Sequence, residues 1–322
     1  MAAQQIYKRK VDWDQAAFRK MRATWSPERK AEDRKILRRV FNKAAASPTL
    51  AAEMKWAKAH GIKFFIDRTA VNCGGYYTLS TGVVAIGARY AFDDSGMEVL
   101  AHELRHAWQD YHGLIACHGK TPKFGNFSTF FINNAMIEAD AMAYGQRVRD
   151  EIRAASLKKR NNPVPAGLQT SLDNENADLG KKFLSWFGNS FYTRFYGDFF
   201  SKAYGRKWGL YEGELPLRNF EHPFDKDVHK SGFDTSDRQD VLRLGVNFSG
   251  TRNYLADLPP EVLPRRILSP SLARTFWGAA NNNQRKLTTA LERAYMEDIF
   301  APERVNGRLK ATRSALPRHP WP

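Results

Sequence analysis

The chain of 322 residues is 43% hydrophobic and 13% aromatic, which excludes a disordered protein and allows one large domain or two ordinary ones. No stretch approaches the roughly 20 apolar residues of a membrane-spanning helix, and the polar start of the chain lacks the apolar core of a secretory signal. The formal net charge of +16 favours an anionic partner, such as nucleic acid, a membrane surface or an acidic protein.

The positive charge is concentrated at the beginning of the chain. Residues 1–60 hold fifteen lysines and arginines against six acidic residues, which gives more than half of the net charge. This region is either a solvated helical surface or a binding surface for nucleic acid or an acidic partner. The two cysteines, Cys73 and Cys117, indicate free thiols rather than a disulfide, because the sequence shows no export signal. We expect a cytoplasmic protein, with signal-independent secretion as an effector as the alternative.

The first predicted elements are helices, followed by strands. Residues 12–60 predict two or three amphipathic helices, and the Ser-Pro pairs at Ser26 and Ser47 are helix-start signals with proline at the first helical position. The spacing of the apolar residues then changes from that of helices to that of strands. Three short strands are predicted, over residues 62–66, 76–79 and 83–86.

Longer helices follow the strands. A loop over residues 93–96 precedes a helix over residues 97–112, which Gly113 ends. A second helix is predicted over residues 128–155, and the segment 158–165 breaks its pattern. Two further amphipathic helices are predicted, over residues 179–204 and 283–300.

The helix over residues 97–112 contains the motif His102-Glu103-Leu104-Arg105-His106. Residues four apart lie on one face of an α-helix, so the imidazoles of His102 and His106 lie side by side and can bind one Zn²⁺. Glu103 stands next to them and can take a proton. A chance occurrence is disfavoured, because histidine is a rare residue, with 8 in this chain. The motif therefore predicts a zinc site with a catalytic glutamate.

A catalytic zinc needs three protein ligands and an open position for water. The favoured third ligand is Glu138, which lies within the apolar pattern of the second helix, where a carboxylate needs a counter-charge. The alternative is His118, which would give a three-histidine set resembling that of the SprT/Spartan proteases, with a His-Gly pair after the motif helix. Asp140 and His112 are the remaining candidates.

The motif helix, with the sequence AHELRHAWQ, and the sequence EADA at residues 138–141 together resemble a known family. It is a poorly characterised group of bacterial, gluzincin-like metallopeptidases, catalogued as a domain of unknown function, and the similarity covers about residues 62–155. The resemblance implies zinc bound by both motif histidines and Glu138, with Glu103 as the catalytic residue. It implies nothing for the basic N-terminal region or the C-terminal half.

The resemblance also implies an α+β fold with a zincin-like core, in which a small antiparallel sheet packs on the motif helix and a second ligand helix. Mainly helical extensions precede and follow this core. The predicted regions are a basic helical N-terminal region, the metallopeptidase core and a mostly helical and loop-rich C-terminal region of unknown role, over residues 1–60, 61–157 and 158–322. The strands over residues 76–79 and 83–86 either hold an extended peptide by strand addition or form an ordinary hairpin.

The predicted reaction is the hydrolysis of peptide bonds in a protein or peptide substrate. A bound zinc ion lowers the pKa of its water towards neutrality, and Glu103 takes the proton and passes it to the leaving amine. The tetrahedral intermediate needs a further donor, for which Tyr144, His222 and His229 are candidates. A zinc-bound imidazole also needs an acceptor for its other ring nitrogen, and Asp110, one turn beyond the second histidine, is a candidate.

Two other classes of function compete with this prediction. A nucleic-acid-binding protein would explain the charge and the aromatic residues interleaved with lysine and arginine over residues 186–207, although no known nucleic-acid-binding motif accompanies them. A structural zinc is the other alternative, but Glu103 is intact and the ligand set leaves one coordination position open. The first alternative can also combine with proteolysis, since a basic protease can act on nucleic-acid-bound proteins.

Overall fold

The structure is a computed structural model, and it describes residues 13–70, 74–91, 93–115, 127–187, 238–259, 262, 304–305 and 308–309. The chain divides into two compact units. The first unit comprises Met1–His112, Asp140–Lys182 and Val246–Tyr254, and the second comprises Gly113–Ala139, Phe183–Gly245 and Leu255–Pro322. Several predictions fall outside the described residues, namely those on Cys73, Cys117, His118, His222, His229, residues 188–207 and the helix over residues 283–300.

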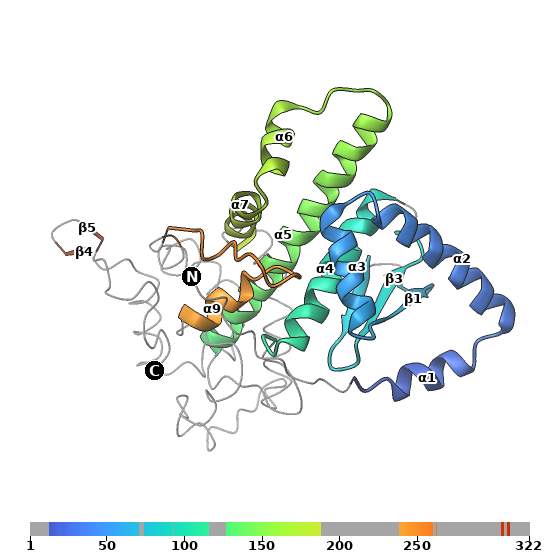
Figure 1. The fold of residues 1–322 in the computed structure, drawn as a ribbon. Coiled ribbons are helices and arrows are strands. Elements are labelled where there is room, and N and C mark those ends of the chain that lie inside the picture. The colour runs from blue at the N-terminus through green and yellow to red at the C-terminus, as the bar shows by residue number, and fades with distance from the viewer. Residues whose placement is uncertain are drawn as a thin grey trace, which may run out of the picture. The chain divides into compact units, whose positions relative to one another are not determined.

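The basic N-terminal region forms three helices, as predicted: α1 (Ala16–Ala23), α2 (Pro27–Ala44) and α3 (Pro48–Ala59) (Figure 1). Both predicted start signals are N-caps. The hydroxyl of Ser26 accepts a hydrogen bond from the Arg29 N–H at 3.2 Å, and that of Ser47 accepts one from the Leu50 N–H at 3.0 Å. Each hydroxyl satisfies a backbone donor that the first turn of a helix leaves without an intrahelical partner.

Three strands form a mixed sheet in the order β1-β3-β2: β1 (Lys63–Asp67), β2 (Gly75–Thr78) and β3 (Val83–Gly87). β2 and β3 form an antiparallel hairpin, whereas β1 runs parallel to β3. The prediction of an antiparallel sheet is therefore wrong for β1. The alternation of apolar residues identifies a strand but not its neighbour, and β1 pairs with the edge of β3 that the hairpin leaves open.

The two faces of the sheet pack against different side chains, because neighbouring residues of a strand point to opposite faces. On one face, a buried cluster joins α1 and the turn after it to β1 and β3, and it consists of Phe18, Trp25, Phe65, Val83 and Ala85. On the other face, Phe64 contacts Phe41 of α2, with ring centroids 5.2 Å apart. The N-terminal helices therefore hold β1 from both sides.

Helix α4 (Asp94–Tyr111) carries the H-E-x-x-H motif and packs on β2, β3 and α3 (Figure 1). Asp93 caps its start by accepting a hydrogen bond from the Gly96 N–H at 2.8 Å. The helix ends before Gly113, whose φ of +69° is the left-handed conformation that ends many helices. The buried apolar side of α4 consists of Met97, Leu100, Ala101, Leu104, Ala107 and Trp108. This side fixes the rotation of the helix, and with it the direction of the motif residues.

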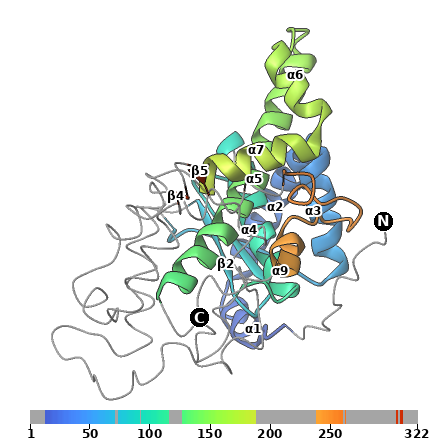
Figure 2. The same ribbon diagram turned by 90° about the vertical axis from the view of Figure 1, so that its left-hand side faces the viewer.

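Helix α5 (Phe127–Lys159) is continuous over 33 residues and passes directly against α4 (Figure 2). The boundary between the two units falls inside this helix, between Ala139 and Asp140. A Cβ at Gly145 would lie 2.8 Å from the backbone oxygen of Glu98 in α4, closer than real Cβ atoms come to other atoms. Glycine is therefore required for the backbones of the two helices to touch at this point.

Helix α5 also binds the start of α3. The carboxylate of Glu151 accepts hydrogen bonds from the Thr49 N–H at 3.0 Å, the Thr49 hydroxyl at 2.7 Å and the Arg147 guanidinium at 2.7 Å. A negative charge is favourable at the N-terminus of a helix. The contact joins the N-terminal helices to α5 within the first unit. The region boundaries predicted at residues 60 and 157 stay predictions.

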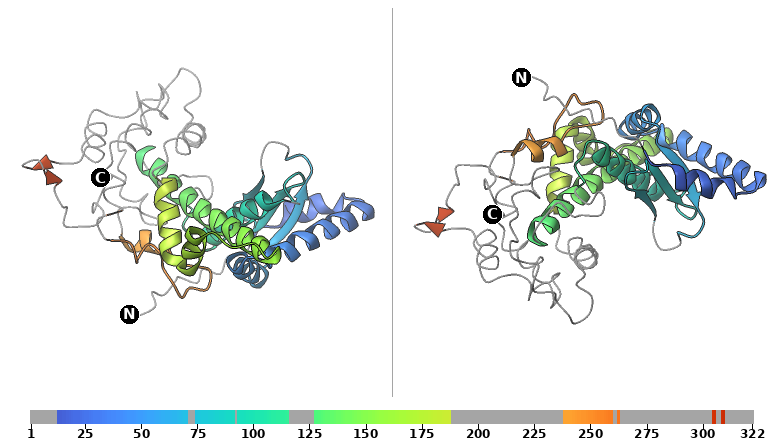
Figure 3. Two further views of the ribbon diagram at one scale, coloured as in Figure 1. Left: turned by 90° about the horizontal axis from the view of Figure 1, so that it is seen from above. Right: turned by 90° about the horizontal axis from the view of Figure 1, so that it is seen from below.

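The break predicted over residues 158–165 is confirmed, because α5 ends at Lys159 and a further helix, α6 (Ala166–Asp173), begins at Ala166. Helix α7 (Glu175–Phe187) packs across α5, held by Lys182–Asp150 and Arg147–Asp178 ion pairs of 2.9 and 3.1 Å (Figure 3). The other elements in the described part of the chain are α9 (Arg238–Leu244) and the paired strands β4 (Arg304–Val305) and β5 (Arg308–Leu309). None of the described helices has the length and apolarity needed to cross a membrane.

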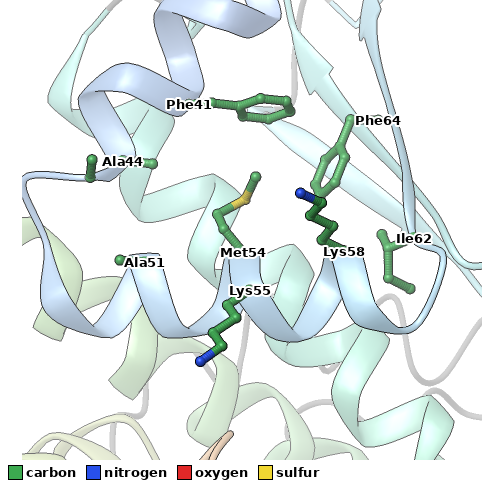
Figure 4. A pocket seen from close by; sticks show the side chains of 9 residues that line it. Phe41, Ala44, Ala51, Met54, Lys55, Lys58, Ile62 and Phe64 are labelled. Carbon is green, nitrogen blue, oxygen red and sulfur yellow. The ribbon is translucent and has the colours of Figure 1, made fainter.

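An apolar pocket of about 560 Å³ lies between α2, α3 and the start of β1 (Figure 4). Its lining residues are Phe41, Ala44, Ala45, Ala51, Met54, Lys55, Lys58, Ile62 and Phe64. None of the candidate site residues of the sequence analysis lines this pocket. It is a feature of the N-terminal helices rather than of the motif helix.

Replacing Gly145 by alanine tests the contact between α4 and α5. The added methyl group pushes against backbone, so we expect the free energy of unfolding to fall by about 1–3 kcal/mol. The matched control is Gly167→Ala in α6, where a Cβ meets nothing within 4 Å and where alanine stabilises a helix by about 0.5–1 kcal/mol relative to glycine. Chemical denaturation measures both variants, and equal changes in stability would contradict the close approach.

Candidate metal centre

Helix α4 brings the two histidines of the motif together. His102 and His106 lie one turn apart on the same face, with ring centroids 4.5 Å apart and Nε2 atoms 3.0 Å apart. His102 is 8% exposed, and His106 is half-buried. The side-by-side arrangement that the spacing predicts is therefore present.

Glu138 of α5 forms a cluster with these histidines. Each of the three side chains offers one ligand atom, and these atoms all lie within 4.8 Å of one another. Glu138 lies two residues before Asp140 on one continuous helix, so the contacts that hold Asp140 against α4 also place Glu138. Among the described residues, no such cluster contains Asp140 or His112, and His118 lies outside the part of the chain that the structure describes.

The three side chains fit a zinc ion by their chemistry and by their spacing. Two imidazole nitrogens and one carboxylate oxygen are a ligand set of catalytic zinc. Two nitrogens that each lie about 2.0–2.1 Å from a tetrahedral zinc are roughly 3.3 Å apart, close to the 3.0 Å between the two Nε2 atoms here. Glu103 follows His102 in the helix and is 9% exposed, so it stands beside the cluster in a largely buried position.

A buried ion pair joins α4 to α5. Neither Arg105 nor Asp140 has exposed surface, and the guanidinium donates from Nε to Oδ2 at 2.7 Å and from Nη2 to Oδ1 at 3.2 Å. Burial works against the charge of Arg105, but the adjacent carboxylate outweighs it and raises the pKa of the guanidinium. A two-pronged pair of this kind allows one relative orientation of the two side chains, and so it aligns the two helices.

Aromatic rings enclose the Arg105 guanidinium. Its Cζ atom lies 3.9 Å from the ring centroid of Trp108, 4.1 Å from that of Tyr144 and 5.3 Å from that of Phe248. Nη2 also donates a hydrogen bond to the backbone oxygen of Val246 at 2.9 Å. These contacts replace the water that a buried cation loses.

Asp140 connects this ion pair to the histidines. It accepts two further hydrogen bonds, from the Gln109 side-chain amide at 2.7 Å and from the Tyr254 hydroxyl at 2.6 Å. The Oε1 atom of Gln109 lies 2.7 Å from Nδ1 of His106. A continuous chain of hydrogen bonds therefore runs from Arg105 to one of the candidate metal ligands.

The prediction that Asp110 accepts a hydrogen bond from a metal-binding imidazole is wrong for His106, because Gln109 occupies that place. Asp110 instead binds the β2–β3 hairpin, accepting hydrogen bonds from the Tyr77 hydroxyl at 2.6 Å and the Ser80 N–H at 2.7 Å. Burial, together with the nearby Asp110 carboxylate, raises the pKa of Tyr77. Asp110 thus fixes the hairpin to the motif helix.

Tyr144, a sequence candidate for stabilising the tetrahedral intermediate, is 1% exposed and packs on Arg105. Its burial is explained by this contact.

Glu53 of α3 lies in the same buried region, and burial raises its pKa well above the usual range, partly offset by the charge of Arg105. Burial therefore favours the neutral acid form of Glu53 over its carboxylate.

The sequence patterns predicted no role for Arg105 and Gln109, and Asp140 was a candidate only as a metal ligand. A signal was present, since these residues lie in helices whose neighbouring positions are apolar and buried, where polar side chains need partners. The partners Val246 and Tyr254 carried no such signal, because Val246 follows Arg105 by 141 positions and Tyr254 follows Asp140 by 114.

Comparison with known proteins points to the same class of site. Residues 15–164 match the model of a family described as "Putative metallopeptidase family (DUF6782)". No curated protein and no solved structure matches the chain. The matched segment contains both histidines, Glu103 and Glu138. The similarity supports a metal-dependent peptidase and gives no indication of a nucleic-acid partner, which stays a prediction from charge.

Replacing Asp140 by asparagine tests the buried ion pair. The substitution leaves the enclosed Arg105 charge without its counter-charge, so we expect the free energy of unfolding to fall by about 3–5 kcal/mol. The control is Glu98→Gln, which breaks a 3.2 Å pair with the exposed Arg149 and should change stability by under about 1 kcal/mol. Denaturant titration compares the two variants. Similar small losses in both would show that the buried pair is dispensable.

Proposed function

We propose that the protein is a zinc-dependent metallopeptidase of the gluzincin type, in which His102, His106 and Glu138 bind the metal. One observation carries the proposal: two imidazole nitrogens and one carboxylate oxygen lie within 4.8 Å of one another. Two histidines and one glutamate are the zinc ligands of thermolysin-like peptidases. The match of residues 15–164 to a family of metallopeptidases supports the same class of enzyme.

The proposed mechanism assigns the proton transfers to Glu103. His102, His106 and Glu138 would hold the ion, and a bound zinc would supply a water of lowered pKa and would polarise the carbonyl of the scissile bond. Glu103 takes the proton from the attacking water and passes it to the nitrogen of the leaving amine. Its position next to His102 and its low exposure of 9% support this role, because a general base must lie within reach of the proton that it takes.

We further propose that the substrate peptide binds along strand β2. This strand lies at one edge of the three-stranded sheet and packs on α4, the helix that carries the motif. Edge strands are where an extended peptide adds to a sheet, and β2 is the edge strand that follows on from the hairpin with β3. The hydrogen bonds from Tyr77 and Ser80 to Asp110 hold this hairpin on α4 and support the proposal.

The substitution Glu103→Gln tests the mechanism. Glutamine keeps the shape of the side chain but cannot take a proton, so peptide hydrolysis should fall by about 10²–10⁴-fold, while zinc content stays near one ion per chain. Elemental analysis and a fluorogenic peptide assay measure the two quantities. Glu98→Gln, on the same helix, should keep full activity. An active Glu103→Gln variant would exclude this residue as the base.

The third ligand can be identified by comparing Glu138→Ala with His118→Ala. If Glu138 binds the metal, its loss removes one of three protein ligands, and zinc affinity and hydrolysis should both fall by at least about 10–100-fold. His118→Ala should retain both properties. Competition with a chromophoric chelator measures the zinc dissociation constant. Loss of zinc in the His118 variant alone would replace the gluzincin set by a three-histidine set.

A further inference from the structure

The two nitrogens of the His106 ring have different surroundings. Nε2 lies 3.0 Å from Nε2 of His102, inside the candidate ligand cluster. Nδ1 lies 2.7 Å from Oε1 of Gln109. A neutral imidazole carries its proton on one nitrogen and presents a lone pair at the other. Binding of a metal through Nε2 therefore requires the proton on Nδ1.

The hydrogen bonds of Gln109 decide which nitrogen carries the proton. A carboxylate can only accept hydrogen bonds, and both oxygens of Asp140 accept from the guanidinium of Arg105, which can only donate. The atom of Gln109 that lies 2.7 Å from Asp140 must then be the amide nitrogen, which donates. The amide oxygen consequently faces His106.

An amide oxygen accepts hydrogen bonds and cannot donate one. The His106 nitrogen at 2.7 Å from this oxygen, Nδ1, must therefore be the donor. The Nε2 lone pair is then directed into the cluster with His102 and Glu138. The permanent positive charge of Arg105 thus fixes the proton of His106 through the hydrogen bonds of Asp140 and Gln109.

We propose that Gln109 is a positioning residue that holds His106 in the Nδ1–H tautomer, with Asp140 and Arg105 fixing the orientation of its amide. The proposal deepens the proposed function and rests on it, since Nε2 of His106 is the atom that would bind zinc. A neutral amide does here what a carboxylate or a backbone carbonyl does for many metal-binding histidines. Gln109 lies between the negative charge of Asp140 and the imidazole of His106.

The tautomer of His106 is measured by NMR of the full-length, zinc-free protein labelled with ¹⁵N-histidine. We expect the Nδ1–H form in the wild type. Gln109→Leu removes the acceptor, so His106 should shift to a mixture of tautomers or to the Nε2–H form. Gln109→Glu keeps an acceptor oxygen next to Nδ1 and, with a proton shared between its other oxygen and Asp140, should retain the Nδ1–H form. His60 is the internal reference, because its Nδ1 donates to the backbone oxygen of Trp56 at 2.8 Å, and neither residue is substituted.

Zinc binding gives the second readout. The dissociation constant should rise by about 10–100-fold in Gln109→Leu and by less in Gln109→Glu, because only the leucine variant lacks the acceptor. A merely structural role would lower stability without changing the tautomer. An Nε2–H form of His106 in the wild type, or an unchanged tautomer and zinc affinity in Gln109→Leu, would overturn the proposal.

The two proposals can fail separately. If the wild-type protein binds no zinc, the proposed function fails, but the tautomer of His106 still decides whether Gln109 positions this ring. If zinc binds and peptides are cleaved while Gln109→Leu keeps the wild-type tautomer and affinity, the function stands and Gln109 has no positioning role.

Discussion

The ion pair between Arg105 and Asp140 is the interaction on which the candidate site depends. It lies entirely inside the protein, where a charge without a partner costs far more than the pair contributes to stability. Its value is geometric, because a guanidinium fork and a carboxylate match in one orientation. The pair aligns α4, which carries His102 and His106, with α5, and α5 carries Glu138 two residues before Asp140.

The rest of the first unit keeps these two helices in register. The sheet and α3 support α4, and Asp110 binds the hairpin to its last turn. Glu151 of α5 binds the start of α3, so the basic N-terminal helices also help to hold α5 in place. Gly145 lets the two central helices touch, which brings a carboxylate on one within reach of the imidazoles on the other.

Local patterns in the sequence were sufficient to predict the main helices, the three strands and the approach of the two histidines. Helix periodicity, Ser-Pro caps and the i, i+4 spacing act over a few residues, so a single segment contains the information. The parallel pairing of β1 with β3 was missed, because strand alternation does not specify a neighbour. The role of Gln109 was missed for a similar reason. It depends on the contact of Gln109 with Asp140, 31 positions away on another helix, and Asp140 is in turn bound by Arg105, 35 positions away, and by Tyr254, 114 positions away.

The segment Val246–Tyr254 has a consequence for where the folding unit ends. The match to the family model stops at residue 164, yet Val246, Phe248 and Tyr254 supply a carbonyl, a ring face and a hydroxyl to the buried charges. A fragment trimmed to the matched segment would leave Arg105 open to solvent on one side and deprive Asp140 of a donor. The part of the chain that shields the charges of Arg105 and Asp140 from water is therefore discontinuous in sequence.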